Sequence, residues 1–248
     1  MRRNDDTSML EKVMLILQTF RTAGGPQRLA DIARSTHLPK STVHRLIQPL
    51  LDLNLLQRVD GGFALGLVLF ELGELVPVKS QLRQAALPFM QDLFAATHQT
   101  VHLGVRDGYD VVYAEKIHGH GGVDLPSRIG GRLPLTCTGI GKALLAFALP
   151  EVLDEVLGQP LRRLTPHSIT DLDLLKDEVS RVQTAGVAYD REEAAVGGCC
   201  VAAPVVVSGV AIAALSVSVP VAQFQPARLG PAVRTAALGL SRKLNRLW

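Results

Sequence analysis

The chain has 248 residues, of which 47% are apolar and 20% charged, a composition that fits one large or two small globular domains and excludes a disordered chain. Its net charge of +3 does not by itself indicate a nucleic-acid partner. The charged start lacks the apolar core of a signal peptide, and the most apolar run, at 201–222, is broken by Pro204, Gly209 and Pro220. Its three cysteines form no disulfide framework, so we expect a reduced, cytoplasmic protein with no membrane partner.

The first 66 residues predict three helices followed by a hairpin. Apolar residues recur at helical spacing over 10–21 and again over 28–36, and the stretch AGGP between them is typical of a turn. A third helix follows from Pro39, a residue suited to a first turn, and its apolar stripe begins at Val43. Residues 55–66 contain Asp-Gly-Gly, which favours a tight hairpin. We therefore predict a winged helix-turn-helix domain over 8–66.

The polar face of the third helix is rich in hydrogen-bond donors. Between Arg21 and Arg58 six Lys or Arg residues stand against two acids, a local excess that suits a phosphate-facing surface. In a helix-turn-helix the second helix of the pair enters the major groove, where an arginine such as Arg45 pairs well with guanine. An ordinary surface helix is the alternative. The candidate DNA-binding residues are Arg28, Lys40, Ser41, Thr42, His44, Arg45, Gln48 and Arg58.

Pro49 lies inside this third helix and removes a backbone donor. We expect a bend there, or an early end to regular helix. The motif itself should survive, because the residues that would face DNA precede Pro49.

Residues 67–86 indicate a helical linker, interrupted at Val76-Pro77-Val78, and residues 87–248 a second domain. Alternating patterns predict strands at 100–105, 110–117, 187–190, 200–207 and 210–219, and a short apolar strand within the glycine-rich stretch 119–131. Helical patterns occupy 138–149, 151–157, 172–185 and 226–248. Because strands and helices lack βαβ regularity, the fold class is α+β.

Several chemistries are not supported in the second domain. The stretch TGIGKA resembles half of a phosphate loop, but Ala143 follows Lys142 where Ser or Thr is needed. Two alternatives remain for its glycines: a helix start that binds an anion such as a carboxylate, or simple close packing. His118 and His120 lack zinc-motif spacing, so we expect no metal and no other cofactor. No nucleophile–base set has motif support, so we predict no catalysis.

Six stretches together resemble the IclR-type transcriptional regulators, over about residues 10–244. They are LADIARSTHLPKSTVHRLIQPLLDLNLLQR, HQTVHLGV, GRLPLTCTGIGKALLAF, AGVAYDREE, GGCCVAAPV and AALSVSVP, in the family's order and spacing. The resemblance implies an N-terminal winged helix-turn-helix, a linker helix and a GAF-like effector-binding domain. It also implies homodimers, commonly paired into homotetramers, on palindromic operators in double-stranded DNA.

The same resemblance implies a pocket for a small organic molecule. Backbone amides at the start of the TGIGKA helix would hold a carboxylate, and the two serines, two residues apart, would share one face of a strand. Leu125, Ile129 and Leu133 would supply an apolar wall. Ordinary packing of small residues is the alternative reading of the serines. The candidate effector-binding residues are Thr138, Gly139, Ile140, Asp190, Cys200, Ser216 and Ser218.

This chain departs from the family pattern at Cys199, which gives a Cys199-Cys200 pair, and in the short loop at 207–209. A redox role for the pair would need an exposed, activated thiolate, for which the sequence gives no sign.

The sequence therefore predicts a DNA-binding transcriptional regulator whose operator binding is modulated by a small metabolite, such as a carboxylate or aromatic acid. Whether it represses or activates depends on where the operator lies relative to a promoter. The rival hypothesis is an enzyme or metabolite-binding protein with an appended helical module.

Overall fold

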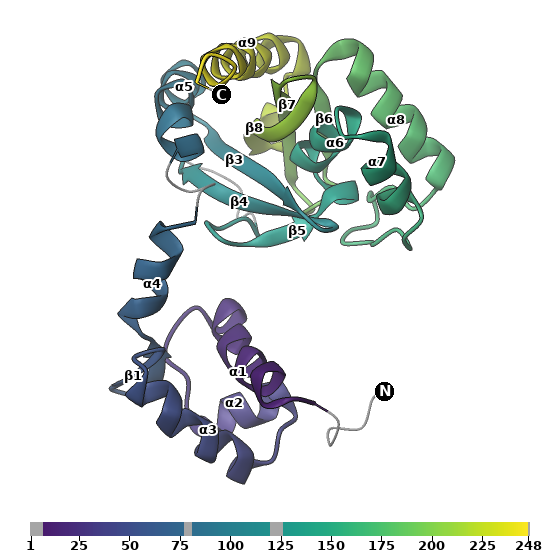
Figure 1. Ribbon diagram of the computed structural model, residues 1–248. Coiled ribbons are helices and arrows are strands. Elements are labelled where there is room, and N and C mark those ends of the chain that lie inside the picture. The colour runs from purple at the N-terminus through teal and green to yellow at the C-terminus, as the bar shows by residue number, and fades with distance from the viewer. Residues whose placement is uncertain (1–6, 77–80, 120–125, 248) are drawn as a thin grey trace. The chain divides into compact units, whose positions relative to one another are not determined.

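The computed structural model describes residues 7–76, 81–119 and 126–247. The contacts within it divide the chain into two compact units, Met1–Val76 and Pro77–Trp248 (Figure 1). Each unit has its own apolar core.

The first unit packs three helices and a two-stranded hairpin around one core. A capping box at Ser8 and Glu11 starts the first helix. Ile16, Ile32 and Val43, one from each helix, are completely buried together in this core. The elements are α1 (Met9–Ala23), α2 (Leu29–Thr36), α3 (Lys40–Asp52), β1 (Leu56–Val59), β2 (Gly62–Leu65) and α4 (Leu67–Glu74).

A tight turn joins α2 to α3. His37 ends α2 in the left-handed conformation, with φ of 56°. Pro39 precedes α3 as its N-cap, and its carbonyl accepts the first helical hydrogen bond, from Val43 N at 3.0 Å. The early helix end expected at Pro49 is wrong, because regular helix continues to Asp52. Proline removes one backbone donor, while buried Leu46, Ile47 and Leu50 hold both sides of Pro49 against the core.

The hairpin after α3 has its turn at the Asp-Gly-Gly stretch, as expected from the sequence. Asp60 and Gly61 connect β1 to β2, and Gly61 has a φ of 90°. A Cβ on Gly62 would lie 2.2 Å from the carbonyl oxygen of Gln27, so only glycine fits there. Gln27 also pairs with Phe63, which fastens the hairpin to the start of α2.

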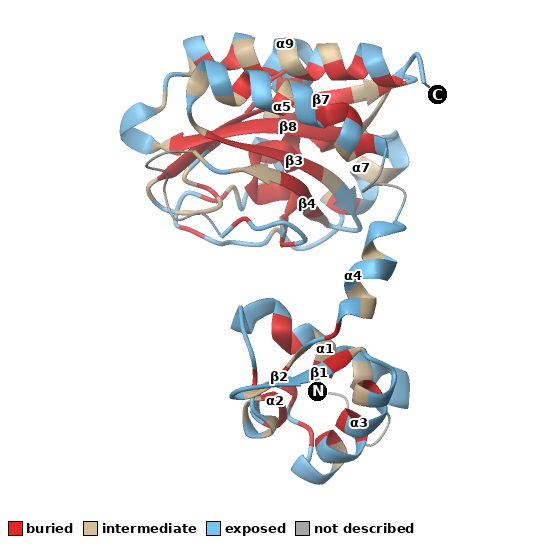
Figure 2. Ribbon diagram, turned by 90° about the vertical axis from the view of Figure 1, so that its left-hand side faces the viewer, coloured by how far each residue is buried: buried red, intermediate tan, exposed pale blue. Residues whose placement is uncertain are grey.

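The second unit is a six-stranded antiparallel sheet with helices on both faces, in the order β5-β4-β3-β8-β7-β6. Its strands are buried while the outer sides of the helices are exposed (Figure 2). The strands are β3 (Thr100–Asp107), β4 (Asp110–Ile117), β5 (Arg132–Pro134), β6 (Ala188–Arg191), β7 (Gly198–Val207) and β8 (Val210–Pro220). The helices are α5 (Arg83–Thr97), α6 (Gly139–Ala146), α7 (Pro150–Leu157), α8 (Leu172–Ala185) and α9 (Pro226–Leu244).

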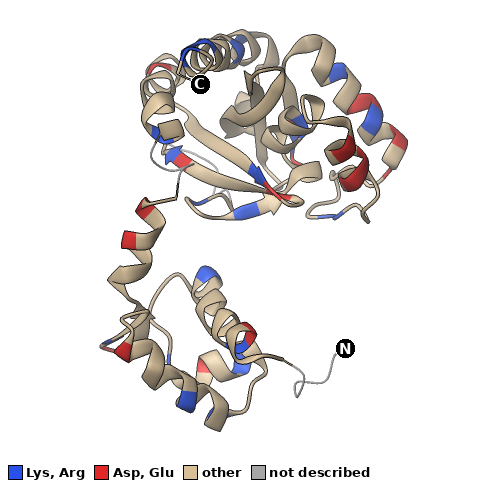
Figure 3. Cartoon of the chain, viewed as in Figure 1, with Lys and Arg blue, Asp and Glu red and all other residues tan. Residues whose placement is uncertain are grey.

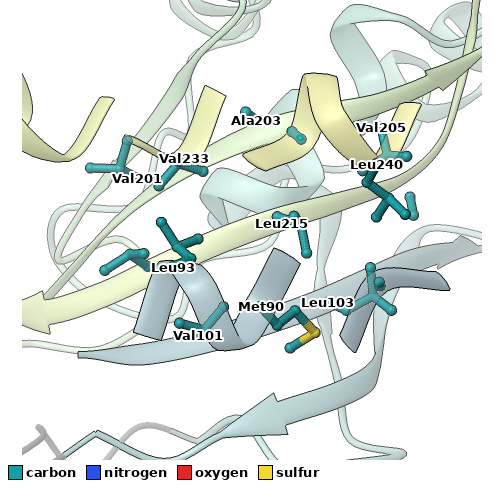
Figure 4. Packing of buried hydrophobic residues seen from close by; sticks show 14 of the residues in the cluster. Met90, Leu93, Val101, Leu103, Val201, Ala203, Val205, Leu215, Val233 and Leu240 are labelled. Carbon is teal, nitrogen blue, oxygen red and sulfur yellow. The ribbon is translucent and has the colours of Figure 1, made fainter. Parts of the chain in front are cut away.

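Each face of this sheet has its own core. Helices α5 and α9 cover one face, where Met90, Leu93 and Val233 pack on strand residues such as Val201 and Leu215 (Figure 4). Helices α6, α7 and α8 cover the other face. Because successive strand residues point to opposite faces, Cys200, Ser216 and Ser218 lie on the α6 side. This alternation brings polar side chains of β7 and β8 to one face.

The short strand expected within 119–131 stays a prediction, because residues 120–125 of that stretch lie outside the described residues. In residues 126–131 a hydrogen bond from Gly131 N to the Arg128 carbonyl forms a turn before β5, which begins at Arg132. One expected element differs from the structure. The last helix ends at Leu244 rather than at Trp248, which is itself outside the described residues.

Candidate functional site

Helix α3 presents a continuous polar face to solvent. Lys40, His44 and Gln48 follow one another at four-residue spacing and are all exposed. Ser41 and Arg45 are exposed beside them, while Thr42, the sixth candidate on this helix, is half-buried. Figure 3 shows basic residues on α3, whereas acids gather on α7 and α8 of the other unit. The polar face is thus free of the core and carries positive charge.

The candidate side chains differ in what already engages them. Among the described residues none pairs with the Arg45 guanidinium, whereas Gln48 Nε2 donates to Asp52 Oδ1 at 2.8 Å. Arg58 lies over the Phe63 ring, 5.4 Å from its centroid. Arg28, exposed at the start of α2, follows Gln27, the residue that pairs with Phe63. Gln27, next to Arg28 in the chain, and Arg58 therefore both contact Phe63 of the hairpin.

The second unit contains a small cavity of about 20 Å³ on the α6 side of the sheet. Six of the seven predicted effector-binding residues line it: Thr138, Ile140, Asp190, Cys200, Ser216 and Ser218. Gly139 does not line it, and a Cβ at this position would lie 2.7 Å from Cys200 Sγ. Of the expected apolar wall, Leu133 is present and Ile129 is exposed away from the cavity. Leu125 lies outside the described residues.

The sequence reasoning missed three polar residues of this cavity: His102, Tyr113 and Ser127. His102 pairs with Ser216 across β3 and β8, and its Nε2 lies 2.8 Å from Ser127 Oγ. Burial lowers the pKa of His102 to about 3, so the imidazole is neutral at physiological pH. Strand alternation from Thr100, in the quoted HQTVHLGV stretch, was the signal that could have placed His102 on the serine face.

Asp190 is the acid of the cavity. Burial, and next the negative charge of Glu193, raise its pKa from 3.8 to about 7. Its Oδ1 accepts a hydrogen bond from Glu193 N at 2.7 Å. Around neutral pH the carboxyl is therefore present in both its acid and its charged form. Among the described residues that line the cavity there is no Lys or Arg.

Burial also raises the pKa of the Cys200 thiol, and the negative charge of Asp190 adds to this. The Cys200 sulfur lies 3.9 Å from Asp190 Oδ2. A buried neutral thiol beside an acid is a poor nucleophile, which argues against redox activation of the Cys199-Cys200 pair.

The start of α6 explains the glycines of TGIGKA. Thr138 Oγ1 caps the helix by accepting from Gly141 N at 2.9 Å. A Cβ on Gly141 would lie 2.0 Å from the carbonyl oxygen of Leu135, so close packing requires glycine at this position. The Ile140 side chain lines the cavity at the first turn of the helix, where backbone N–H groups favour an anion.

Other classes of site find no support in the described residues. No group of three or more His, Cys, Asp or Glu side chains there could hold a metal ion. In the same residues, no helix has the length and apolar character needed to cross a membrane.

Comparison with known proteins gives the family. The IclR helix-turn-helix domain matches residues 9–60, and the bacterial transcriptional regulator IclR C-terminal domain matches residues 76–242. The HTH-type transcriptional regulator XynR of Escherichia coli is 34% identical over 246 residues, covering 95% of this chain and 96% of XynR. The regulator KdgR of Dickeya chrysanthemi is 35% identical over 230 residues, covering 90% of this chain and 74% of KdgR.

Solved structures agree. An IclR homologue from Microbacterium hydrocarbonoxydans, complexed with 4-hydroxybenzoate, is 33% identical with a TM-score of 0.87, covering 96% of this chain and all of that one. The Thermotoga maritima IclR is 29% identical with a TM-score of 0.78, covering 95% of this chain and 98% of that one. The chain belongs to the IclR family of bacterial transcriptional regulators, and its family and relatives are regulators rather than enzymes.

Replacement of Asp190 by Asn should change how stability depends on pH. Because the folded pKa of about 7 exceeds the unfolded value of 3.8, Asp190 contributes stability at low pH that is lost as pH rises through 7. As pH rises from 3.8 to about 7, the unfolding free energy of the wild type should fall relative to that of Asp190→Asn by up to about 4 kcal/mol. Urea unfolding at a series of pH values measures this difference. His102, which titrates in both proteins, cancels from it, and a difference independent of pH would contradict the assignment.

Proposed function

We propose that this chain is a sequence-specific operator-binding regulator whose DNA binding is modulated by a small carboxylate or aromatic acid. The observation that carries the proposal is a cavity that collects Asp190, Ser216 and Ser218, all indicated in advance by the sequence. A regulator of this family with such a cavity has a place to bind a small polar molecule away from its DNA-binding helix.

The cavity chemistry suits an aromatic acid. The first turn of α6 offers backbone N–H groups to a carboxylate, and Ser216 and Ser218 offer hydroxyl donors. Neutral His102 and the Tyr113 phenol, whose pKa burial raises, add polar groups without charge. Asp190 can accept from a ligand hydroxyl when charged. The relative crystallised with 4-hydroxybenzoate supports this ligand class, because that molecule carries both a carboxylate and a hydroxyl.

Ligand binding would change DNA binding by shifting a population. A ligand shifts an equilibrium only if it binds the DNA-competent and incompetent arrangements with different affinities. We assign the lever to α4, between the winged helix and the effector-binding unit.

We further propose that the chain forms a homodimer, two of which could pair into a homotetramer. Helix α4 is mostly apolar, yet none of its residues is buried. Leu67, Leu72 and Leu75 are 66%, 57% and 77% exposed. An apolar surface of this kind needs a partner in water, and a second copy supplies one together with the second recognition helix that a palindromic site requires.

Leu72→Asp should weaken the dimer, because it places a charge in the apolar surface of α4. Sedimentation of the full chain over a range of concentrations measures the dissociation constant, which should rise at least about tenfold. Leu174→Asp on α8 is the matched control, since both leucines are 57% exposed. Equal effects of the two variants, or none, would contradict an α4 dimer.

Arg45→Ala should cost about 1–3 kcal/mol of specific operator binding if Arg45 reads a base. Binding of the purified protein to its own upstream DNA, at fixed salt and against random DNA, measures the loss. Arg34→Ala removes the same charge from α2, where Arg34 is exposed and pairs with Asp31, and should have little effect. Equal losses of specific and nonspecific binding would make Arg45 a phosphate contact. No loss of either would contradict the recognition helix.

A panel of small carboxylic and aromatic acids, including 4-hydroxybenzoate, tests the ligand class. One member should bind the full chain in calorimetry and weaken or strengthen operator binding. Ser218→Ala should reduce its affinity by up to about tenfold, the value of one hydrogen bond. Ser180→Ala, on the exposed side of α8, should leave it unchanged. Operator binding that is indifferent to every compound would contradict the proposed ligand class.

A further inference from the structure

Lys142 is a charged side chain in the interior of the second unit. It lies on α6, whose first residues line the cavity, and it is only 1% exposed. Its Nζ lies 2.5 Å from Glu193 Oε1 and 3.8 Å from Glu178 Oε1. Because a buried ion pair is often no more stable than apolar residues of the same volume, its presence calls for a reason other than stability.

Glu193 joins this pair to the acid of the cavity. Its backbone N–H donates to Asp190 Oδ1 at 2.7 Å, while its side chain holds Lys142. Its carbonyl accepts from Ser168 Oγ at 2.7 Å, which fixes the backbone between β6 and β7. One residue therefore connects α6, this loop and Asp190. Neither Lys142 nor Glu193 lines the cavity itself.

The charges around Asp190 come from this pair. Glu193 raises the pKa of Asp190 and Lys142 lowers it. Burial holds the other titratable groups of the cavity lining neutral: His102 of β3, Tyr113 of β4, and Cys199 and Cys200 of β7. Glu178 of α8 lies beyond Lys142 and also pairs with Arg181, at 3.3 Å.

The two carboxylate oxygens of Glu193 differ in their partners. Glu193 Oε1 takes the ammonium of Lys142, but within the described residues no donor reaches buried Glu193 Oε2. Part of the Glu193 charge is therefore left to act on its neighbour Asp190.

We propose that the buried Lys142–Glu193 ion pair is a positioning element of the effector pocket: it holds Asp190 against the start of α6 and sets the charge that the pocket presents to a ligand. This inference rests on the proposed effector function of the same cavity. Through Asp190, the pair tunes how readily the pocket accepts an anionic ligand.

Infrared titration of the full chain, without ligand, tests the pair directly. The C=O absorption of a protonated carboxyl group that disappears in Asp190→Asn reports the protonation of Asp190. Glu193→Gln removes the negative neighbour and leaves Lys142, so this absorption should be lost at a pH about one unit lower or more. Lys142→Met leaves two uncompensated carboxyls, so acid absorption should persist to higher pH, whichever of the two holds the proton.

A charge effect moves the pH of this titration in opposite directions in Glu193→Gln and Lys142→Met. Simple loosening of the structure would move it in the same direction in both variants. Lys142→Met/Glu193→Gln removes both charges and should titrate between the two single variants, and it keeps the test intact if Lys142→Met fails to fold. Lys176→Met and Glu151→Gln, at exposed positions on α8 and α7, are the matched charge controls. Equal shifts in the two single variants, an unchanged Glu193→Gln titration, or no absorption lost in Asp190→Asn would overturn the proposal.

A second arm with 4-hydroxybenzoate separates this inference from the proposed function. If the compound binds, its affinity should fall as pH rises through the Asp190 titration of each variant, because charged Asp190 repels a carboxylate. If the infrared shifts appear but the compound does not bind, the role of the ion pair stands and 4-hydroxybenzoate is not the ligand. If the compound binds with the same pH dependence in every variant, the proposed role of the ion pair is contradicted.

Discussion

The effector-binding unit depends on one constraint: strands β7 and β8 are buried on both faces. Residues that point toward α5 and α9 must be apolar to form the larger core, and Val201, Leu215 and Val217 are completely buried there. Their neighbours in the chain necessarily point toward α6. Because one residue of register would exchange the two faces, the valines that build the core also fix where Cys200, Ser216 and Ser218 must lie.

Burial of the serine face gives the cavity its electrostatic character. The cavity is lined by residues of the sheet, of α6 and of the loop after β6, and its acid and imidazole side chains are themselves buried, so a charge on them is poorly hydrated. His102 and Cys200 respond by staying neutral, and Asp190 holds its proton to about pH 7. The permanent charges nearby are those of Lys142 and Glu193, which pair with each other and do not line the cavity. A ligand therefore meets hydrogen-bonding groups, with one acid whose charge can change.

Local pattern was enough to predict much of this molecule. The apolar stripe from Val43 gave α3, the Asp-Gly-Gly turn gave the hairpin, and alternation placed Ser216 and Ser218 on one face. What escaped prediction depends on contacts far apart in the chain. His102 meets Ser127, 25 residues later, and Lys142 meets Glu193, 51 residues later. No spacing rule encodes such pairs, since the packing of whole elements brings them together.

Pro49 and Gly141 are two positions where local pattern left the outcome open and contacts in the folded chain decided it. A proline inside a helix suggested a bend or an early end, but a buried apolar stripe on both sides of Pro49 lets α3 continue to Asp52. At Gly141 the sequence left an anion site and close packing open, and the approach of Leu135 shows that packing alone requires the glycine. The glycines therefore give no evidence for an anion site, and the Gly141 N–H at the start of α6 is already bonded to Thr138 Oγ1. In this fold, Gly141 permits the close approach of α6 to Leu135, and the polar chemistry of the cavity lies with the side chains that line it.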